Sequence, residues 1–174
     1  EITIRYFWLA LCAILAFVAV FNYSKAHEIQ GDLAKRRLLE VSLQDLIVQS
    51  TALHHLGNPH TYETQLGLET RGYRSPQELL NQLASRLAVI ETINTHSGLA
   101  DSAANLREHL ITMDQQLEKF GKPDPQRIEF WLIELGIFNS TLKRNTQEAD
   151  EKVNQLQRNN LILTLVVLIH SVGF

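Results

Sequence analysis

The histidines are the side chains of this chain best suited to binding a metal, and their spacing argues against a metal site on a helix. Seven occur, at positions 27, 54, 55, 60, 96, 109 and 170. No two are three or four residues apart, so no helix face presents two imidazoles to one ion. Glu-x-x-His, which di-iron helical bundles need, is absent. His54, His55 and His60 lie close in sequence, but adjacent His54 and His55 point to different helix faces, which favours solvated or capping roles. We predict no metal site.

No motif of an enzyme active site is present either. A P-loop, a glycine-rich dinucleotide fingerprint, HExxH and CxxC are all absent. Each candidate serine nucleophile lies at a predicted cap, turn or helix seam, where a structural role explains it. We predict no catalytic residue and no cofactor in this chain. Any histidine kinase or cyclase activity is expected beyond residue 174.

Residues 58–75 are predicted to form a long loop, or a loop with one short turn, and they concentrate side chains that suit a small ligand at the membrane-distal end of the fold. Guanidinium groups bind carboxylates through paired hydrogen bonds, and aromatic rings cover the body of a small molecule. The candidate residues for binding a small anion are His60, Tyr62, Arg71, Tyr73 and Arg74. In the alternative interpretation, the tyrosines cap the core and the arginine heads lie in solvent.

The first element that positions this loop is an apolar segment near the N-terminus. Residues 6–23 contain no charged side chain, and their length lies within the roughly 17 to 25 residues that cross a bilayer as a helix. Aromatic rings lie at both ends of the segment, with Arg5 before it and Lys25 after it. We predict a transmembrane helix over 6–23 with a cytoplasmic flank over 1–5. A cleavable signal peptide is the alternative, but its apolar stretch is usually shorter.

A second apolar segment lies at the other end of the chain. The fourteen residues 161–174 are apolar except for Thr164, His170 and Ser171. As a helix they cover about 21 Å, short of the roughly 30 Å hydrocarbon core. A helix lying on the membrane surface needs a polar face, which this segment lacks. We predict that residues 159–174 are the truncated start of a second transmembrane helix.

Between the two apolar segments the sequence predicts an all-α domain over residues 24–158. Apolar residues recur at steps of three and four, and no strand alternation is found. The predicted helices cover about 24–57, 76–96, 99–120 and 125–160. Ser75 to Glu78 form a capping box with Pro at the first helical position, and Gly121 is placed as a helix stop. Residues 97 and 98 favour a tight turn between the second and third helices, with one kinked helix as the alternative.

Helix lengths predict the architecture. The second and third helices are about 30 Å long and the first and last about 50 Å, so the short pair covers only half of the long pair. We predict an up-down four-helix bundle on a helical stalk that is continuous with two transmembrane helices. The stalk residues 145–160 carry a thin apolar stripe, which would be better buried by a second copy. A homodimer is therefore expected.

The charge and the cysteine content of the chain limit the classes of partner and the compartment that we expect. The net charge is −3, and no block of basic residues is longer than Lys35 to Arg37, so no nucleic-acid partner is expected. The single cysteine, Cys12, lies in the first apolar segment. The domain itself has no cysteine, which suits an oxidising compartment without requiring one.

This layout resembles the sensor regions of bacterial transmembrane receptors, namely sensor histidine kinases, methyl-accepting chemotaxis proteins and membrane-bound cyclic-di-GMP enzymes. The resemblance implies a dimeric, periplasmic domain anchored in the inner membrane. Such a domain detects a small ligand or a periplasmic binding protein and passes a movement of its last helix to a cytoplasmic HAMP, kinase or cyclase module. No ligand-binding motif matches residue by residue. The competing hypothesis is a structural membrane protein that docks another periplasmic protein without sensing.

Overall fold

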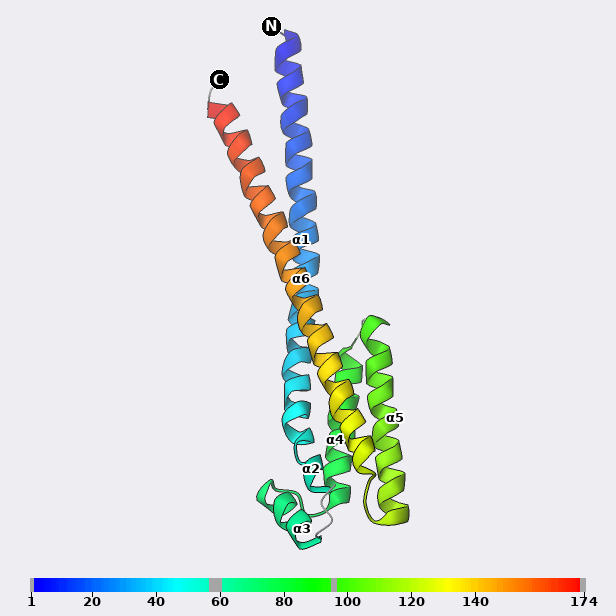
Figure 1. The fold of residues 1–174 in the computed structure, drawn as a ribbon. Coiled ribbons are helices and arrows are strands. Elements are labelled where there is room, and N and C mark those ends of the chain that lie inside the picture. The colour runs from blue at the N-terminus through cyan, green and yellow to red at the C-terminus, as the bar shows by residue number, and fades with distance from the viewer. Residues whose placement is uncertain (1, 57–60, 95–96, 173–174) are drawn as a thin grey trace. The chain divides into compact units, whose positions relative to one another are not determined.

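The computed structural model describes residues 2–56, 61–94 and 97–172, and these residues are all-α, as predicted. No strand occurs among them. Figure 1 labels the helices along the chain. Their bounds are α1 Ile2–Ser50, α2 Leu53–Leu56, α3 Thr61–Thr70, α4 Pro76–Ile93, α5 Ser97–Phe120 and α6 Pro125–Val172.

Two compact units divide the chain. The terminal unit comprises Glu1–Lys35 and Asn145–Phe174, and the central unit comprises Arg36–Arg144. The terminal unit therefore holds the first part of α1 and the last part of α6, and the central unit holds α2 to α5 with the remainder of the two long helices. Each unit is described on its own below.

In the terminal unit, α1 carries the candidate membrane span. It is the only helix among the described residues that is long and apolar enough to cross a membrane, and none of its most apolar stretch is buried inside the protein. Phe17, for example, is 72% exposed. The second predicted span does not meet the same test of length and composition within the part of the chain that the structure describes. The terminal unit thus supplies one candidate span.

The two long helices contact each other within this unit. The side-chain Nδ2 of Asn160 donates to the backbone carbonyl of Ala19 at 3.2 Å. Ala26 and Leu33 of α1 and Val153 of α6 are buried. Ala26 and Leu33 are seven residues apart, about two helical turns, so they lie on the same face of α1.

In the central unit, a leucine-rich core confirms the predicted apolar stripes. Leu39, Leu43 and Leu46 of α1 are almost completely buried. The stripes of the three following long elements are buried with them: Leu80, Leu83, Leu87 and Ile90 of α4, Leu99, Ala103, Leu106, Leu110 and Met113 of α5, and Ile128, Trp131, Leu135, Phe138 and Leu142 of α6. Phe120, the last residue of α5, is 66% exposed and lies outside this core.

Two predicted helix boundaries are confirmed by their capping geometry. The Ser75 hydroxyl accepts from the backbone N–H of Glu78 at 3.1 Å, with Pro76 as the first residue of α4. The Glu78 carboxylate accepts from the backbone N–H of Arg74 rather than that of Ser75, at 2.7 Å. Gly121 follows α5 with φ of +73°, the left-handed conformation that glycine adopts without strain.

The first predicted helix ends earlier than expected, which corrects the predicted range of 24–57. Helix α1 ends at Ser50, and the short helix α2 follows after Thr51 and Ala52. The amide of Ala52 bonds to the carbonyl of Gln49 at 3.0 Å, a tighter pairing than that of an α-helix. The Thr51 hydroxyl also bonds to the Val48 carbonyl at 2.6 Å, so a local side-chain bond competes with helical pairing. Residue 57, where this helix was predicted to end, lies outside the described residues.

The predicted loop over 58–75 is also corrected, because it contains the helix α3, Thr61–Thr70. Gly72 has φ of +85° after the end of this helix. The amide of Tyr73 bonds to the Leu68 carbonyl at 2.9 Å, and the amide of Gly72 bonds to the Glu69 carbonyl at 3.0 Å. This pair of bonds is the Schellman motif, and the buried side chains of Leu68 and Tyr73 accompany it. Gly72 therefore acts as the C-terminal cap of α3.

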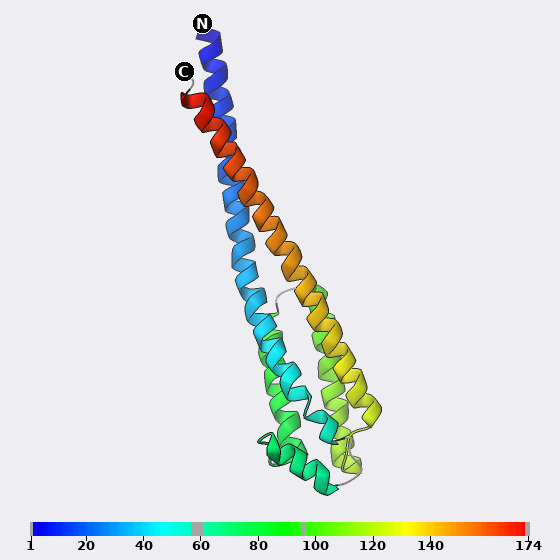
Figure 2. The same cartoon turned by 60° about the vertical axis from the view of Figure 1, so that its left-hand side comes forward.

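Helices α4 and α5 form a hairpin rather than one kinked helix. They lie side by side in both views of the fold (Figures 1 and 2). Gln77 near the start of α4 donates to Asp114 near the end of α5 at 2.6 Å. At the other end of the hairpin, Glu91 of α4 pairs with Arg107 of α5. The two helices are therefore antiparallel, and the connecting residues 95 and 96 lie outside the described residues.

Candidate functional site

The residues predicted to bind an anion do not share one environment. His60 lies outside the described residues, and Tyr62 belongs to α3, with a side chain that is also outside the description. Arg71 is exposed, and its Nη1 donates to the Thr51 hydroxyl at 2.5 Å. Arg74 is exposed as well. The structure thus places two guanidinium groups on the surface beside the end of α3.

Tyr73 lies in the core of the central unit instead of on this surface. Its side chain is only 6% exposed and belongs to the same cluster as the leucines of α4. Burial raises the pKa of the Tyr73 hydroxyl, while Arg71 lowers the pKa and Glu78 raises it further. This placement agrees with the interpretation in which a tyrosine caps the core. The ligand role of these residues stays a prediction.

The histidines do not assemble a metal site among the residues that the structure describes, where no group of three His, Cys, Asp or Glu side chains comes together. His55 of α2 packs against Gly67 of α3 so closely that a Cβ at position 67 would overlap the imidazole ring. His54 is exposed. The contact of His55 is therefore structural.

His109 takes part in a polar contact between α5 and α6. Its Nδ1 lies 3.2 Å from Nη1 of Arg127, and its ring packs against Phe130 with centroids 6.4 Å apart. Burial lowers the pKa of His109, Arg127 lowers it as well, and Glu134 and Glu108 raise it. A neutral imidazole accepts the hydrogen bond that the guanidinium donates.

Sequence reasoning missed a hollow between α4 and α5. Its volume is about 410 Å³. It is lined by Glu91 of α4, by Asn94 directly after that helix, and by Ala100, Ala103, Ala104, Arg107, Glu108 and Ile111 of α5. A smaller hollow of about 160 Å³ continues along the same two helices and shares Glu91, Arg107 and Ile111. The run of alanines in α5 is the only sequence signal for this space, and alanines also suit ordinary helix packing.

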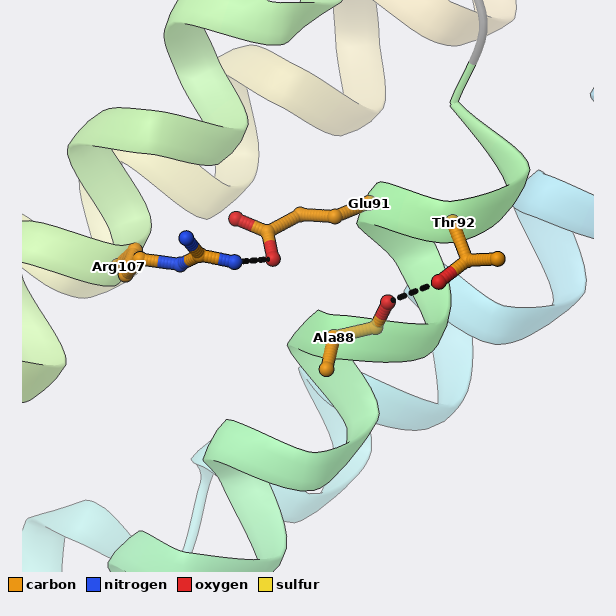
Figure 3. A network of polar contacts seen from close by, with 4 residues as sticks. All are labelled: Ala88, Glu91, Thr92 and Arg107. Carbon is orange, nitrogen blue, oxygen red and sulfur yellow. Dashed lines mark hydrogen bonds and ion pairs between the residues drawn. The ribbon is translucent and has the colours of Figure 1, made fainter.

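An ion pair lies in the wall of both hollows. Nη2 of Arg107 pairs with Oε2 of Glu91, as Figure 3 shows. The Arg107 side chain is 60% exposed and the Glu91 side chain 21% exposed. In the same view, the Thr92 hydroxyl donates to the Ala88 carbonyl at 2.8 Å. Thr92 is therefore bonded to its own helix, and the charged pair provides the polar chemistry of the hollow.

The comparisons with known proteins give no relative for this arrangement. No protein-family model matches the chain, and no curated protein or solved structure is found to be similar. The function is therefore argued from the sequence and the geometry.

Proposed function

We propose that the chain is the sensor region of a membrane-anchored bacterial receptor. The observation that carries the proposal is the continuity of the two long helices. Helix α1 contains both the apolar segment and the core residues Leu39 to Leu46, without a break between them. Helix α6 contains both the core residues Ile128 to Leu142 and the apolar C-terminal residues. A helix that is rigid along its length transmits a displacement from a binding domain to a membrane segment.

The proposed architecture is a four-helix bundle of α1, α4, α5 and α6 on a stalk that enters the inner membrane at two places. The second entry rests on residues 161–169 near the end of α6, which are apolar except for Thr164 and mostly exposed. The central unit then lies in the periplasm, and a cytoplasmic kinase, cyclase or methyl-accepting module follows the second span. Support comes from the apolar character of both ends and from the resemblance to receptor sensor regions.

Cysteine accessibility tests this topology, because Cys12 is the only native cysteine and can be replaced by serine. Glu129→Cys places a thiol on an exposed position of α6 in the central unit. In intact bacterial cells with a permeabilised outer membrane, an impermeant maleimide should label this thiol. A thiol at Thr3 should be labelled only after lysis. Labelling of Glu129→Cys only after lysis, or extraction of the chain by alkaline carbonate, would rule out the proposed topology.

The receptor is proposed to act as a homodimer, with a second copy against the stalk residues 145–160. A cysteine scan over the exposed positions 151, 152, 154, 155, 157, 158 and 159 tests this arrangement. Disulfide formation should rise and fall with the helical period of about 3.6 residues. Absence of any periodic cross-linking, with and without a signal, would contradict a dimeric stalk.

Docking of another periplasmic protein is the second candidate function. Phe130, Ile133 and Ile137 of α6 are 46%, 51% and 49% exposed, at spacings that place them on one helix face. An exposed apolar stripe of this kind is typical of a protein interface. Replacing Ile133 and Ile137 with Ser should abolish docking but should leave small-ligand binding unchanged, which separates the two candidates.

A further inference from the structure

We propose that the larger hollow between α4 and α5 binds a small zwitterion, whose carboxylate pairs with Arg107 while its cationic group pairs with Glu91. This inference deepens the proposed receptor function by naming the class of ligand. The inference depends on the proposed function only for what ligand binding does to the receptor, and not for the binding itself. Binding itself is measured on the purified chain, so its failure is distinguishable from a failure of the membrane topology.

The size of the hollow suits a small molecule. Its volume of about 410 Å³ lies within the roughly 300 to 1,000 Å³ of ligand pockets. Ala100, Ala103 and Ala104 form part of the lining, and their short side chains leave room between the two helices. Ile111 adds an apolar surface that is 52% exposed. A ligand with a short hydrocarbon body would cover these atoms.

The charges of the hollow determine what the ligand must carry. Arg107 and Glu91 pair with each other, so both charges are compensated in the absence of a ligand. A simple carboxylate that took Arg107 would leave Glu91, whose side chain is only 21% exposed, without its partner, whereas a simple amine that took Glu91 would forgo the guanidinium and leave it to solvent. An uncompensated and partly buried charge is costly. A zwitterion supplies both charges at once, so it can insert into the ion pair without leaving either residue unpaired.

The groups beside the ion pair suit a ligand whose carboxylate faces Arg107 and whose cationic group faces Glu91. Glu108, the exposed residue next to Arg107, also lines the hollow and adds a second negative charge beside it. The guanidinium of Arg107 has the planar fork that binds a carboxylate through two parallel hydrogen bonds. Its 60% exposed side chain has the freedom to turn from Glu91 toward an arriving ligand.

Calorimetric titration of the full chain in detergent micelles tests the proposal with defined probes. The zwitterions are L-alanine, 4-aminobutyrate and glycine betaine, which differ in charge separation and in the cationic group. Propionate and propylammonium are the single-charge controls. At least one zwitterion should bind with a Kd below about 1 mM, and both single-charge probes should bind at least about 10-fold more weakly. No binding of any zwitterion, or equal binding of propionate, would overturn the proposal.

Substitutions in and beside the larger hollow test whether the zwitterion binds there. Arg107→Gln and Glu91→Gln should each weaken binding of the zwitterion by about 10-fold or more. Ala104→Leu should block binding by filling the larger hollow, because Ala104 is exposed and its enlargement is tolerated by the fold. Ala84→Leu is the matched control, since Ala84 is also an exposed helical alanine but lines only the smaller hollow. Undiminished binding by Ala104→Leu would place the ligand elsewhere.

The double variant Glu91→Arg with Arg107→Glu distinguishes direct pairing from a structural role. It restores an ion pair with reversed polarity, and a zwitterion can bind to it in the opposite orientation. We expect this variant to bind within about 10-fold of the wild type, whereas each of its single substitutions should not bind detectably. If the double variant folds, as shown by an unchanged circular dichroism spectrum, but binds no better than the single variants, the proposed pairing is wrong.

Discussion

The indole N–H of Trp131 donates to the hydroxyl of Ser50 at 2.9 Å, and both side chains are completely buried. The bond joins α6 to the last residue of α1 inside the core of the central unit. A buried indole needs a partner for its N–H, because an unpaired donor in an apolar surrounding is costly. Ser50 supplies that partner at the point where α1 ends.

Ser50→Ala should therefore destabilise the central unit. The substitution leaves the indole N–H unpaired, at a cost of about 1–3 kcal/mol. Trp131→Phe removes the donor and should also destabilise, through the lost bond and the smaller ring. Thermal unfolding by circular dichroism measures both effects. The loss of stability in the double variant should be smaller than the sum of the losses in the two single variants. Strict additivity would show that the bond between Trp131 and Ser50 contributes nothing to stability.

Two glycines in different backbone conformations should respond to alanine in opposite directions. Gly72 has φ of +85°, and a Cβ there would meet no neighbouring atom, so the strain is purely conformational. Gly72→Ala should cost about 1–2 kcal/mol. Gly136 lies inside α6, where a Cβ also meets open space. Gly136→Ala is the matched control and should gain up to about 1 kcal/mol of helix propensity. Urea unfolding of both variants measures the difference, and equal effects would contradict the capping role of Gly72.

Gly67 should tolerate alanine only when His55 is shortened. A Cβ at position 67 would overlap the His55 imidazole, so Gly67→Ala forces that ring out of its place against α3 or shifts the two helices apart. We expect a loss of about 1–3 kcal/mol, which exceeds the gain in helix propensity. In the His55→Ala background the same substitution should be stabilising by up to about 1 kcal/mol. Thermal melts of the four proteins test this, and a destabilising Gly67→Ala in the His55→Ala background would show that another contact requires glycine.

His109 should make the stability of the central unit depend on pH. Burial, with help from Arg127, lowers the pKa of His109 below its usual value of about 6.5. On acidification the unfolded chain therefore takes up this proton before the folded chain does. The stabilisation that neutral His109 contributes to folding is complete above about pH 6.5. It is lost as the pH falls through the pKa of His109 in the folded chain.

His109→Gln keeps an acceptor near Arg127 and removes the titration. Between pH 7 and pH 5, the wild type should lose more stability than this variant in urea unfolding. His54→Gln is the control for the substitution itself, because the His54 ring is exposed and lies outside the contact with Arg127. An identical pH dependence in the wild type and His109→Gln would mean that the Arg127 contact does not discriminate between the two protonation states.

Much of the helical content could be predicted because its signals are local. Leu80, Leu83 and Leu87 recur at the helical period, and all three are buried. Ser75 and Gly121 were identified as the start and the end of helices from the residue types that caps require. These features depend on neighbours within a few residues, so they can be predicted from the sequence alone.

The end of α1 and the existence of α3 were predicted wrongly for a shared reason. Ser50 ends its helix beside a tryptophan that is 81 residues away in sequence. Helix α3 has too few apolar residues for a stripe, and it is held by Leu68 and Tyr73, which enter the common core. Long-range packing acts at both places, and at the end of α1 it acts together with the local bond of the Thr51 hydroxyl to the Val48 carbonyl.

The sequence by itself determined the helical class, the apolar N-terminal segment and the faces that become the core, because each follows from composition and a period of a few residues. Only the tertiary structure decided which charged side chains meet. Arg107 and Glu91 are separated along the chain and come together because the α4–α5 hairpin places them across one hollow. Such a pairing depends on the register of two packed helices, and register is set by the whole core rather than by the residues that form the pair.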